Sequence, residues 1–333
     1  WEKTPRPFLR HREFLWQEGH TMHATAEEAK AETERMLNVY ADFCEDILAM
    51  PVTRGQKTEK EKFNGAEATY TIECMMHDRK ALQAGTSHFF GDGFAKAFDI
   101  TFTDQNNQRV NPFQTSWGAS TRLIGGIIMT HGDNNGLVLP PKIAPVQAVI
   151  VPVAAHKPGV TEAAAALRDR LAAAGLRVKL DDSDNSLGWK CAQWEMKGVP
   201  LRVEIGPRDL EQGQCCMVRR SDGEKTFVPI AELEAEAAKQ LQMVHDGLYA
   251  RAKKNLEEHT YAAYSLEEAK QLQQEKGGFI KTMWCESLEC EMKMKEEAGM
   301  SSRCMPFAQE HLGDVCPICG KPAKKMIYWG GAY

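Results

Sequence analysis

The chain has 333 residues, of which 43% are hydrophobic and 26% are charged, a balance typical of a globular protein with two or three domains. Its formal net charge of -5 argues against a general attraction to nucleic acid, so a nucleic-acid partner would have to bind at local basic patches. No apolar run approaches the length of a membrane span, and the ten cysteines favour metal binding in a reducing compartment over a disulfide framework.

The first two dozen residues carry the densest group of reactive side chains. Arg6, Arg10 and Arg12 precede or begin an alternating run that predicts a strand. One face of this strand carries two aromatic rings, a carboxylate and an imidazole, from Phe14, Trp16, Glu18 and His20. Such a face indicates a pocket for a small ligand with an apolar part and a charged amine, next to a phosphate site. The alternative is an amphipathic strand with a solvated basic loop.

The next hundred residues predict a helix and a sheet. The capping box Thr25-Ala26-Glu27-Glu28 predicts a helix that ends at Pro51 and covers a sheet. The polar segment 55–66 predicts a loop of solvated charge. Alternating residues predict strands over 69–75 and 98–103, with the QAGTSH segment at 83–88 as a loop between them.

A change in composition after Pro141 indicates a domain boundary. Before it, Arg122 leads an apolar run that predicts a helix. After it, a strand at 146–153 and a helix capped by Thr161 precede further strands, which predicts a small α/β layer arrangement. The segment 188–209 mixes tryptophans with lysines and arginines, a pattern found where unstacked bases are held, although edge strands with surface charges are the alternative.

A long charged helix is predicted from about Ile230 to Glu258, ahead of two close cysteine pairs. Cys285 and Cys290 are five residues apart, and Cys316 and Cys319 are three apart, which is a strong signal for a tetrahedral zinc site. Cys304 lies between the pairs without a closely spaced partner. The remaining cysteines are predicted to be inert core residues: Cys44, Cys74, Cys191, Cys215 and Cys216.

These motifs resemble those of one enzyme family. Arg10-x-x-x-Phe14, preceded by Trp1-Glu2, resembles the second half of motif 2 of class II aminoacyl-tRNA synthetases, and Arg12–His20 (REFLWQEGH) resembles that motif in prolyl-tRNA synthetases. Gln83–His88 and Gln114–Arg122 resemble the family's Gln-x-x-Thr-Ser-His element and motif 3. The segment 55–66 resembles a prolyl-enzyme signature at the active-site rim, which favours a functional role for it over solvated charge. The zinc-type cysteines and the final Tyr333 resemble the eukaryotic and archaeal type. Because the chain starts one residue after the Arg that opens motif 2, we expect it to be the C-terminal portion of a longer polypeptide.

The resemblance implies an α/β protein with three domains. An α+β catalytic domain on an antiparallel sheet is expected at 1–143, an α/β anticodon-binding domain at 144–257, and a small zinc-bearing α/β domain at 258–333. The implied activity is that of proline-tRNA ligase, with L-proline, tRNA(Pro), ATP, Mg²⁺ and a structural Zn²⁺, in a cytoplasmic homodimer without a membrane association. The alternatives are a catalytically inactive tRNA- or ATP-binding regulator and, from outside the enzymes, a zinc-bearing RNA-binding module.

The resemblance also assigns residues. The catalytic residues are expected to be Arg10 and Arg122. ATP is expected to contact Glu2, Arg10, His11, Gln83, Thr86, Ser120 and Arg122. Proline is expected to contact Trp16, Glu18, His20, His88, Trp117 and Gly118. The anticodon is expected to contact Trp194, Glu195, Arg202 and Arg208, and the zinc is expected on Cys285, Cys290, Cys316 and Cys319.

Overall fold

A computed structural model describes residues 5–333, and its backbone divides into two compact units. The first comprises Trp1–Asp46, Met50–Thr130 and Ala252–Tyr333, and the second comprises Ile47–Ala49 and His131–Arg251. Each unit combines helices with a sheet, which confirms the predicted fold class. The first unit therefore contains both the segment expected to form the catalytic domain and the segment expected to bind zinc.

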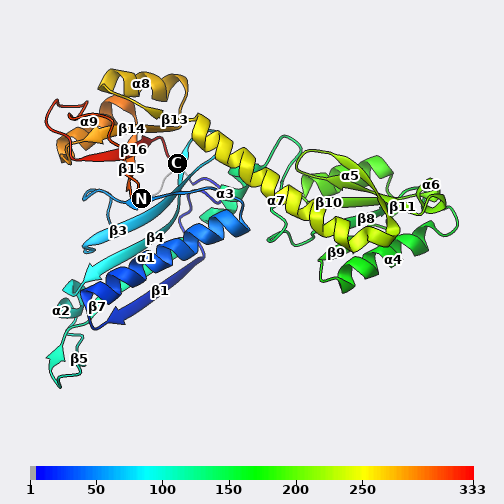
Figure 1. Cartoon of the computed structure of the whole chain (residues 1–333), viewed down its shortest axis with the longest axis horizontal. Helices are drawn as coiled ribbons and strands as arrows, with labels where there is room; N and C mark the ends of the chain where they lie inside the picture. Colours follow the sequence, from blue (N-terminus) through cyan, green and yellow to red (C-terminus); the bar gives the residue numbers. More distant parts are fainter. Residues whose placement is uncertain (1–4) are drawn as a thin grey trace. The chain divides into compact units, whose positions relative to one another are not determined.

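The first unit is built on a nine-stranded sheet with the order β1-β7-β4-β3-β2-β15-β16-β14-β13 (Figure 1). The strands in chain order are Trp16–His23 (β1), Thr53–Gln56 (β2), Ala68–Met75 (β3), Ala81–Gly91 (β4), Phe113–Ser120 (β7), Thr260–Ala262 (β13), Phe279–Trp284 (β14), Ser301–Pro306 (β15) and Lys325–Gly330 (β16). Among these described strands all neighbours are antiparallel except β13 and β14. The C-terminal strands thus extend the sheet that begins with β1.

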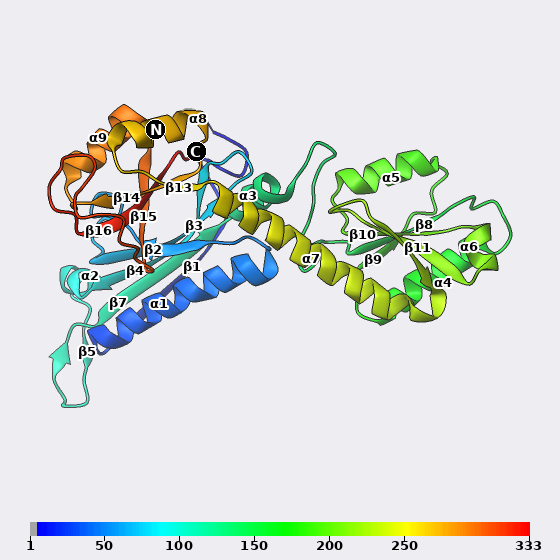
Figure 2. The ribbon, with the colours of Figure 1, turned by 45° about the horizontal axis from the view of Figure 1, so that its top comes forward.

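Helix α1, Ala26–Asp42, lies along one face of this sheet over β1, β7, β4 and β3 (Figures 1 and 2). Its predicted capping box is present, because the Thr25 hydroxyl accepts from the Glu28 amide and the Glu28 carboxylate accepts from the Thr25 amide. The predicted end at Pro51 is too late: the α-helix stops at Asp42 and continues as one π-helical turn, Phe43–Ile47. The opposite face of the sheet is left for the site.

Two sequence predictions around β4 are wrong. The QAGTSH segment is not a loop but the middle of β4, and the stretch 98–103 contains only the two-residue strand β5, Phe102–Thr103, which pairs with β6, Arg109–Val110. The small residues of QAGTSH fit a strand because α1 packs closely there: a Cβ on Gly85 would lie 3.2 Å from the Tyr40 ring. Strand β4 is thereby an interior strand of the sheet, between β7 and β3, rather than a connection.

The remaining helices of the first unit are short. They are Gly93–Ala97 (α2), Arg122–His131 (α3, which ends at the first residue of the second unit), Leu266–Glu275 (α8) and Leu288–Ala298 (α9). Helix α3 begins at Arg122, as predicted. In the C-terminal segment a separate core forms between α8, α9 and their strands, around Trp284, Met294, Cys316 and Trp329.

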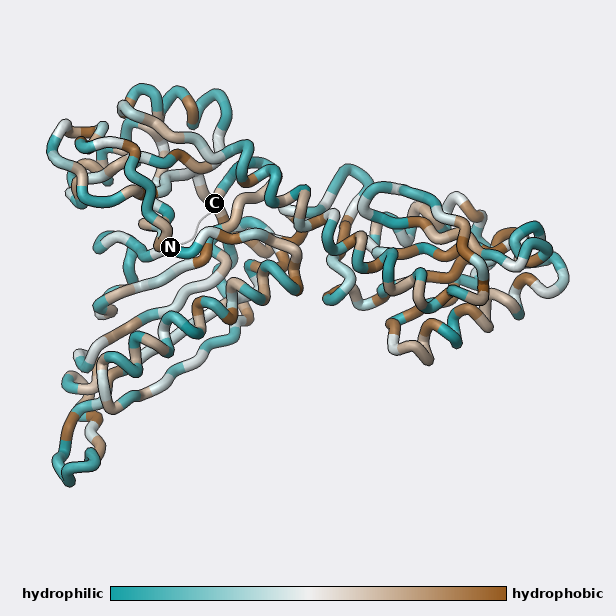
Figure 3. The backbone as a smooth tube through the Cα atoms, viewed as in Figure 1, coloured by the Kyte–Doolittle hydropathy of each residue, from teal (hydrophilic) through white to brown (hydrophobic). Residues whose placement is uncertain are grey.

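The second unit has a five-stranded mixed sheet with the order β12-β11-β10-β8-β9. Its strands are Ala148–Pro152 (β8), Val178–Leu180 (β9), Leu201–Ile205 (β10), Gln214–Arg219 (β11) and Lys225–Pro229 (β12). Its helices are Val160–Ala173 (α4), Leu187–Met196 (α5), Pro207–Glu211 (α6), the 3-10 turn Ile230–Glu232 (η2) and Leu233–Glu258 (α7), which ends in the first unit. The long helix α7 matches the prediction. Figure 3 shows the hydrophobic residues gathered in the central strands of this unit.

Two further predictions in this unit need correction. Thr161 does not cap α4, because the N-cap is Gly159 and the Thr161 hydroxyl donates instead to the Ala155 carbonyl. The first part of the segment 188–209 is not an edge strand but helix α5, capped by Ser186. Across the described residues no helix is long and apolar enough to cross a membrane.

Candidate functional site

Strand register brings the predicted pocket residues onto one face of the first sheet. Glu18 on β1 lies opposite Gly118 on β7, which in turn lies opposite Thr86 on β4. One step along, His20, Ser116 and His88 form the next row. Directly opposed residues in antiparallel strands share a face, so both rows point away from α1. They line a cavity of about 340 Å³ whose other walls include Phe14, Trp16, Glu61, Phe63, Thr69, Gln83 and Ser120.

His88 lies between aromatic rings in the wall of this cavity. Its ring lies 5.1 Å from the Phe63 ring and 5.9 Å from the Phe90 ring. Burial lowers the pKa of His88 to about 4, so the imidazole is neutral at pH 7. The Thr69 hydroxyl accepts a hydrogen bond from the Phe63 amide and lies 3.0 Å from His88 Nδ1. Its own proton can then be donated to Nδ1, which favours the His88 tautomer with the ring proton on Nε2. Because the His88 ring is neutral, it does not repel a cationic ligand group elsewhere in the cavity.

Glu18 supplies negative charge on the neighbouring strand. Its carboxylate lies 3.3 Å from His20 Nε2, and both side chains remain partly exposed at the cavity mouth. Trp16 and Phe14 stand beside them, with ring centroids 6.1 Å apart in an edge-to-face arrangement. Carboxylate and aromatic walls together suit an apolar ring that carries a positive charge.

Trp117 was expected to contact proline, and it is among the residues that line the 340 Å³ cavity. Its side chain belongs to the opposite row, with Gly19 and Ser87 as strand neighbours. Ser87 donates to the Thr33 carbonyl of α1, which fixes this row on the helix side. The Trp117 ring fills the space above Gly19, where a Cβ would come within 2.3 Å of it. Trp117 therefore contributes to the cavity through the strand backbone, next to Gly118, and not through its indole.

A second cavity of about 460 Å³ adjoins Ser120 and gathers the predicted phosphate-binding residues. It is lined by Phe8, Leu9, Arg10, His11, Phe14, Ser120 and Arg122. Arg10 and Arg122 line this one cavity, where burial and the charge of Arg10 lower the pKa of Arg122. The Arg122 amide donates to the Ser120 hydroxyl at the N-terminus of α3. Two cations at a helix N-terminus form a site for a polyanion. Glu2 lies outside the described residues.

The resemblance placed the segment 55–66 at the active-site rim, but sequence reasoning did not single out Lys57. Taken alone the segment looks solvated, yet the Lys57 side chain is only 4% exposed and pairs with Glu73, while lining the 340 Å³ cavity. Glu61 and Phe63 of the same segment line this cavity too. The segment marked the right place on the chain, but only the partners that come from distant strands reveal that Lys57 is buried.

A third cavity, of about 400 Å³, lies within the second unit and contains three of the four predicted anticodon residues. Trp194, Glu195 and Arg202 line it together with Arg219, Arg220 and Lys225, whereas Arg208 lies on α6 and is not among its lining residues. The Trp194 indole donates to Asp181 at 2.7 Å and lies under the Lys197 ammonium at 4.5 Å.

Hydrogen bonds hold Arg220 in place at the edge of this third cavity. Arg220 donates to both carboxylate oxygens of Asp133 at 2.6 and 2.7 Å and to the Glu195 carbonyl at 2.9 Å. Its hydrogen bond with Arg220 is the main reason that the pKa of Asp133 falls to about 2. Cys191, expected to be an inert core residue, is instead half-buried and lines this cavity.

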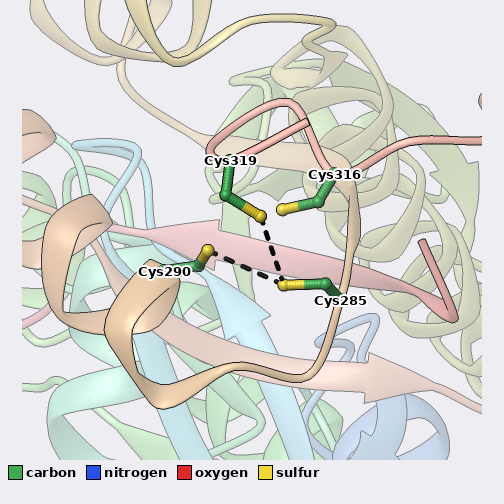
Figure 4. A group of neighbouring side chains, drawn as sticks. All are labelled: Cys285, Cys290, Cys316 and Cys319. Atoms are coloured by element: carbon green, nitrogen blue, oxygen red, sulfur yellow. Dashed lines mark hydrogen bonds between the residues drawn. The ribbon is translucent and has the colours of Figure 1, made fainter. Parts of the chain in front are cut away.

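The four predicted zinc ligands come together in the C-terminal segment (Figure 4). Their sulfur atoms all lie within 4.8 Å of one another, and Cys285 Sγ is 3.6 Å from the sulfurs of both Cys290 and Cys319. Four sulfurs at about 2.3 Å from one tetrahedral ion would be about 3.8 Å apart, so the donor set fits zinc. Cys304 is buried elsewhere and is not part of this group.

A backbone hydrogen bond closes the chain between Cys316 and Gly320 into a tight turn. The Gly320 amide donates to the Cys316 carbonyl at 2.8 Å, and Gly320 has a φ of 73°, which favours glycine. A backbone hydrogen bond at Lys321 lowers the pKa of Cys319 to about 7, whereas burial raises the pKa of Cys290 and Cys316. Two thiols that resist ionisation need a bound cation to become thiolates.

Comparisons with known proteins agree along the chain. Residues 2–131 match the family model "tRNA synthetase class II core domain (G, H, P, S and T)", residues 147–240 match "Anticodon binding domain", and residues 266–333 match "Prolyl-tRNA synthetase, C-terminal".

Individual relatives match the whole chain. A protein of Lachnospira eligens named proline--tRNA ligase is 59% identical over all 333 residues, which cover 70% of that relative. Proline--tRNA ligase 2 of Bacillus cereus and proline--tRNA ligase of Lachnoclostridium phytofermentans are also 59% identical over the whole chain, which spans 70% and 69% of their lengths. The chain therefore belongs to the prolyl-tRNA synthetase family of class II aminoacyl-tRNA synthetases.

Proposed function

We propose that this protein is a proline-tRNA ligase, which activates L-proline with ATP and transfers it to the 3′ end of tRNA(Pro). The observation that carries the proposal is the shared sheet face on which Trp16, Glu18 and His88 adjoin the cavity of Arg10 and Arg122. An aromatic box with one carboxylate lies next to a cationic site. This is the arrangement needed to hold a cyclic amino acid beside a nucleoside triphosphate.

Proline binding is assigned to the 340 Å³ cavity. Glu18 pairs with the secondary ammonium, and the rings of Trp16 and His88 pack against the pyrrolidine, with His20 at the mouth and the backbone of Trp117 and Gly118 as the floor. Because His88 is neutral, it does not repel the ammonium. The carboxylate of proline is then free to point toward the adjoining cationic cavity.

The first chemical step is attack of a proline carboxylate oxygen on the α-phosphorus of ATP. The bond from the α-phosphorus to the bridging oxygen breaks, and pyrophosphate leaves. Arg10 and Arg122 hold the triphosphate and neutralise its charge, which is the main demand of such a transfer. His11, Gln83, Thr86 and Ser120 are assigned to ATP as well, and Glu2 to the adenine amino group. Mg²⁺, when bound with the triphosphate, supplies further neutralisation.

The second unit is assigned to the anticodon of tRNA(Pro). Its 400 Å³ cavity offers Trp194, Glu195 and Arg202 beside further arginines, which suits unstacked bases and phosphates. Arg208 lies outside that cavity, so we assign it at most to the RNA backbone. We also propose a cytoplasmic homodimer, and domain limits of 1–143, 144–257 and 258–333.

The four cysteines are proposed to hold a structural zinc ion. Cys285, Cys290, Cys316 and Cys319 leave no open position for a substrate when all four ligate, so the ion is given no catalytic role. This site, on the segment that matches the prolyl-specific C-terminal model, supports the eukaryotic and archaeal type of the enzyme. The relatives named above come from bacteria. The term "eukaryotic and archaeal type" therefore describes the arrangement of the domains and not the organism of origin.

The test is proline-dependent exchange of pyrophosphate into ATP with the complete gene product. We expect exchange with proline well above that with alanine, threonine or no amino acid. The His88→Ala variant removes one wall of the box and should abolish the exchange while retaining ATP binding. A folded wild-type protein that binds ATP but exchanges with no amino acid would favour the regulatory alternative.

A further inference from the structure

A turn that begins at Thr58 closes one side of the proline cavity. The Thr58 carbonyl accepts from the amides of Glu61 at 3.1 Å and Lys62 at 2.9 Å, and the Thr58 hydroxyl accepts from the Glu61 amide at 3.3 Å. The turn brings Glu61 and Phe63 into the wall of the 340 Å³ cavity. Phe63 is 51% exposed, so packing fixes its ring only in part. The position of that ring therefore depends on the backbone that carries it.

Phe63 belongs to the part of the cavity that is assigned to proline. Its ring lies 5.1 Å from the His88 ring. Its amide donates to the Thr69 hydroxyl at 3.0 Å, and the same hydroxyl lies 3.0 Å from His88 Nδ1. A shift of Phe63 would therefore disturb both the wall of the cavity and the hydroxyl that orients His88.

The turn is tied to the rest of the first unit through one buried residue. Within the stretch 58–65 Thr58 alone is buried, at 1% exposure. Its hydroxyl donates to Glu291 Oε1 at 2.9 Å. Glu291 lies on α9, 233 positions further along the chain, and is only 2% exposed. A helix of the C-terminal segment thus anchors a turn in the wall of the substrate cavity.

Glu291 is itself held from several sides. Ser302 on β15 donates to the same carboxylate oxygen, and its hydroxyl lies 3.4 Å from that of Thr58. Lys60 approaches this oxygen at 3.9 Å from the turn. Strand β15 pairs with β2, which ends at Gln56, so the backbone close to the network is fixed as well. Buried polar groups that satisfy one another favour a single arrangement.

We propose that Glu291 is a positioning residue for recognition of the amino acid, which acts through Thr58 to hold the turn 58–63 against the pocket. The proposal rests on the proposed function, because it takes proline as the occupant of the 340 Å³ cavity. Glu291 is not among the lining residues of that cavity, so its effect on the substrate passes through the turn. A wall that binds the substrate equally in the ground state and the transition state changes the KM and not the kcat.

The experiment measures pyrophosphate exchange with the complete gene product carrying Thr58→Val or Thr58→Ser. Valine nearly keeps the shape of threonine but loses the hydroxyl, so we expect the KM for proline to rise about tenfold, with the kcat and the KM for ATP changed by less than about twofold. Serine keeps the hydroxyl and should keep the proline KM near that of the wild type.

The matched control is Thr282→Val in the C-terminal segment. Thr282 is fully buried, its hydroxyl accepts from Trp329 Nε1 at 2.8 Å, and it is not among the residues that line the cavity. This variant also loses one buried hydroxyl with its hydrogen bond, but at a position away from the turn. It should lower the Tm and leave the KM for proline unchanged.

Two substitutions of Glu291 test the carboxylate itself. Glu291→Gln keeps an acceptor oxygen for both hydroxyls and should keep the proline KM near that of the wild type. Glu291→Met removes the acceptor and should raise the proline KM as Thr58→Val does. Deuterium uptake by the amides of 59–63, measured by mass spectrometry without ligand, should be faster in Glu291→Met and Thr58→Val than in the wild type and Thr282→Val.

A Thr58→Val protein whose proline KM equals that of Thr282→Val would overturn the inference, and so would a KM for ATP that rises as much as the KM for proline. Faster deuterium uptake in the turn with an unchanged proline KM would show that the turn does not shape the pocket. If Glu291→Met fails to fold, Thr58→Val decides the question. Absence of pyrophosphate exchange in the wild type would refute the proposed function instead, and deuterium uptake would still decide whether Glu291 holds the turn.

Discussion

Gly19 and Gly118 lie on neighbouring strands, and a side chain at each would point to opposite faces of the sheet. Replacing each with alanine therefore tests the two faces separately. A Cβ on Gly19 would lie 2.3–2.4 Å from three atoms of the Trp117 ring on the α1 side. A Cβ on Gly118 would lie 3.4 Å from the Trp16 ring on the cavity side, which is ordinary contact. Gly19→Ala should therefore cost stability, whereas Gly118→Ala should fill part of the proline cavity and spare the fold.

The magnitude follows from the shortfall in space. Carbon atoms separate by about 3.5–4.0 Å, so the Trp117 ring must move by more than about 1 Å to admit the Gly19 methyl. Overpacking of this kind costs about 1–3 kcal/mol, against a gain of about 0.5–1 kcal/mol from the lower backbone entropy of alanine in the unfolded chain. A net loss of about 1–2 kcal/mol corresponds to a Tm lower by about 2–8 °C.

Thermal unfolding and proline titration together check this pair. Gly19→Ala should lower the Tm and leave the proline KM nearly unchanged, and Gly118→Ala should raise the proline KM and leave the Tm at or slightly above that of the wild type. A Gly19→Ala protein as stable as the wild type would show that the Trp117 ring does not occupy the α1 side of the sheet. The assignment of Trp117 to the strand floor would then be wrong.

Three other changes have definite expected outcomes. Glu18→Gln removes the charge assigned to the proline ammonium, so the KM for proline should rise about 10- to 100-fold, since hydrogen bonds to charged groups contribute about 1.5–3 kcal/mol; an unchanged KM would exclude this contact. On the proposal that the four cysteines hold zinc, a strong chelator should lower the Tm and expose Cys290 and Cys316 to a thiol reagent, and Cys319→Ser should do the same without a chelator. Burial lowers the pKa of His131 from 6.5 to about 4, so its contribution to stability is present above pH 6.5 and is lost as the pH falls toward 4. The loss should approach about 3 kcal/mol in denaturant titrations, and His131→Gln, which can still donate to the Leu48 carbonyl, should remove this part of the acid sensitivity.

Local patterns predicted much of the site. Phe14, Trp16, Glu18 and His20 all line one cavity. Their alternation predicts this, because every second side chain of a strand points to the same face. The capping box at Thr25 and the clustering of the four cysteines also follow from short spacings that are independent of the rest of the fold.

Other features depend on partners that no local pattern contains. QAGTSH looks like a loop because its residues are small and polar, but those small residues are what let Tyr40 of α1 pack against β4. Lys57 looks solvated because its neighbours are charged, whereas its burial depends on Arg303, 246 positions further along the chain. The resemblance placed Trp117 at the proline cavity, but only its register with Gly19 shows that its ring lies on the α1 side of the sheet. Helix α5 could have been found from the Ser186 cap, a weaker signal than the aromatic residues that follow it.

The pairing of β2 with β15 has a consequence for protein synthesis. Gly55 and Gln56 meet Pro306 and Met305, so one edge of β2 finds its partner only after about 250 more residues have been made. During that interval the growing chain exposes an unpaired strand edge, which makes it prone to aggregation. Ribosome-bound nascent chains should therefore bind chaperones near β2 until β15 emerges, and the release of those chaperones would report completion of the substrate pocket.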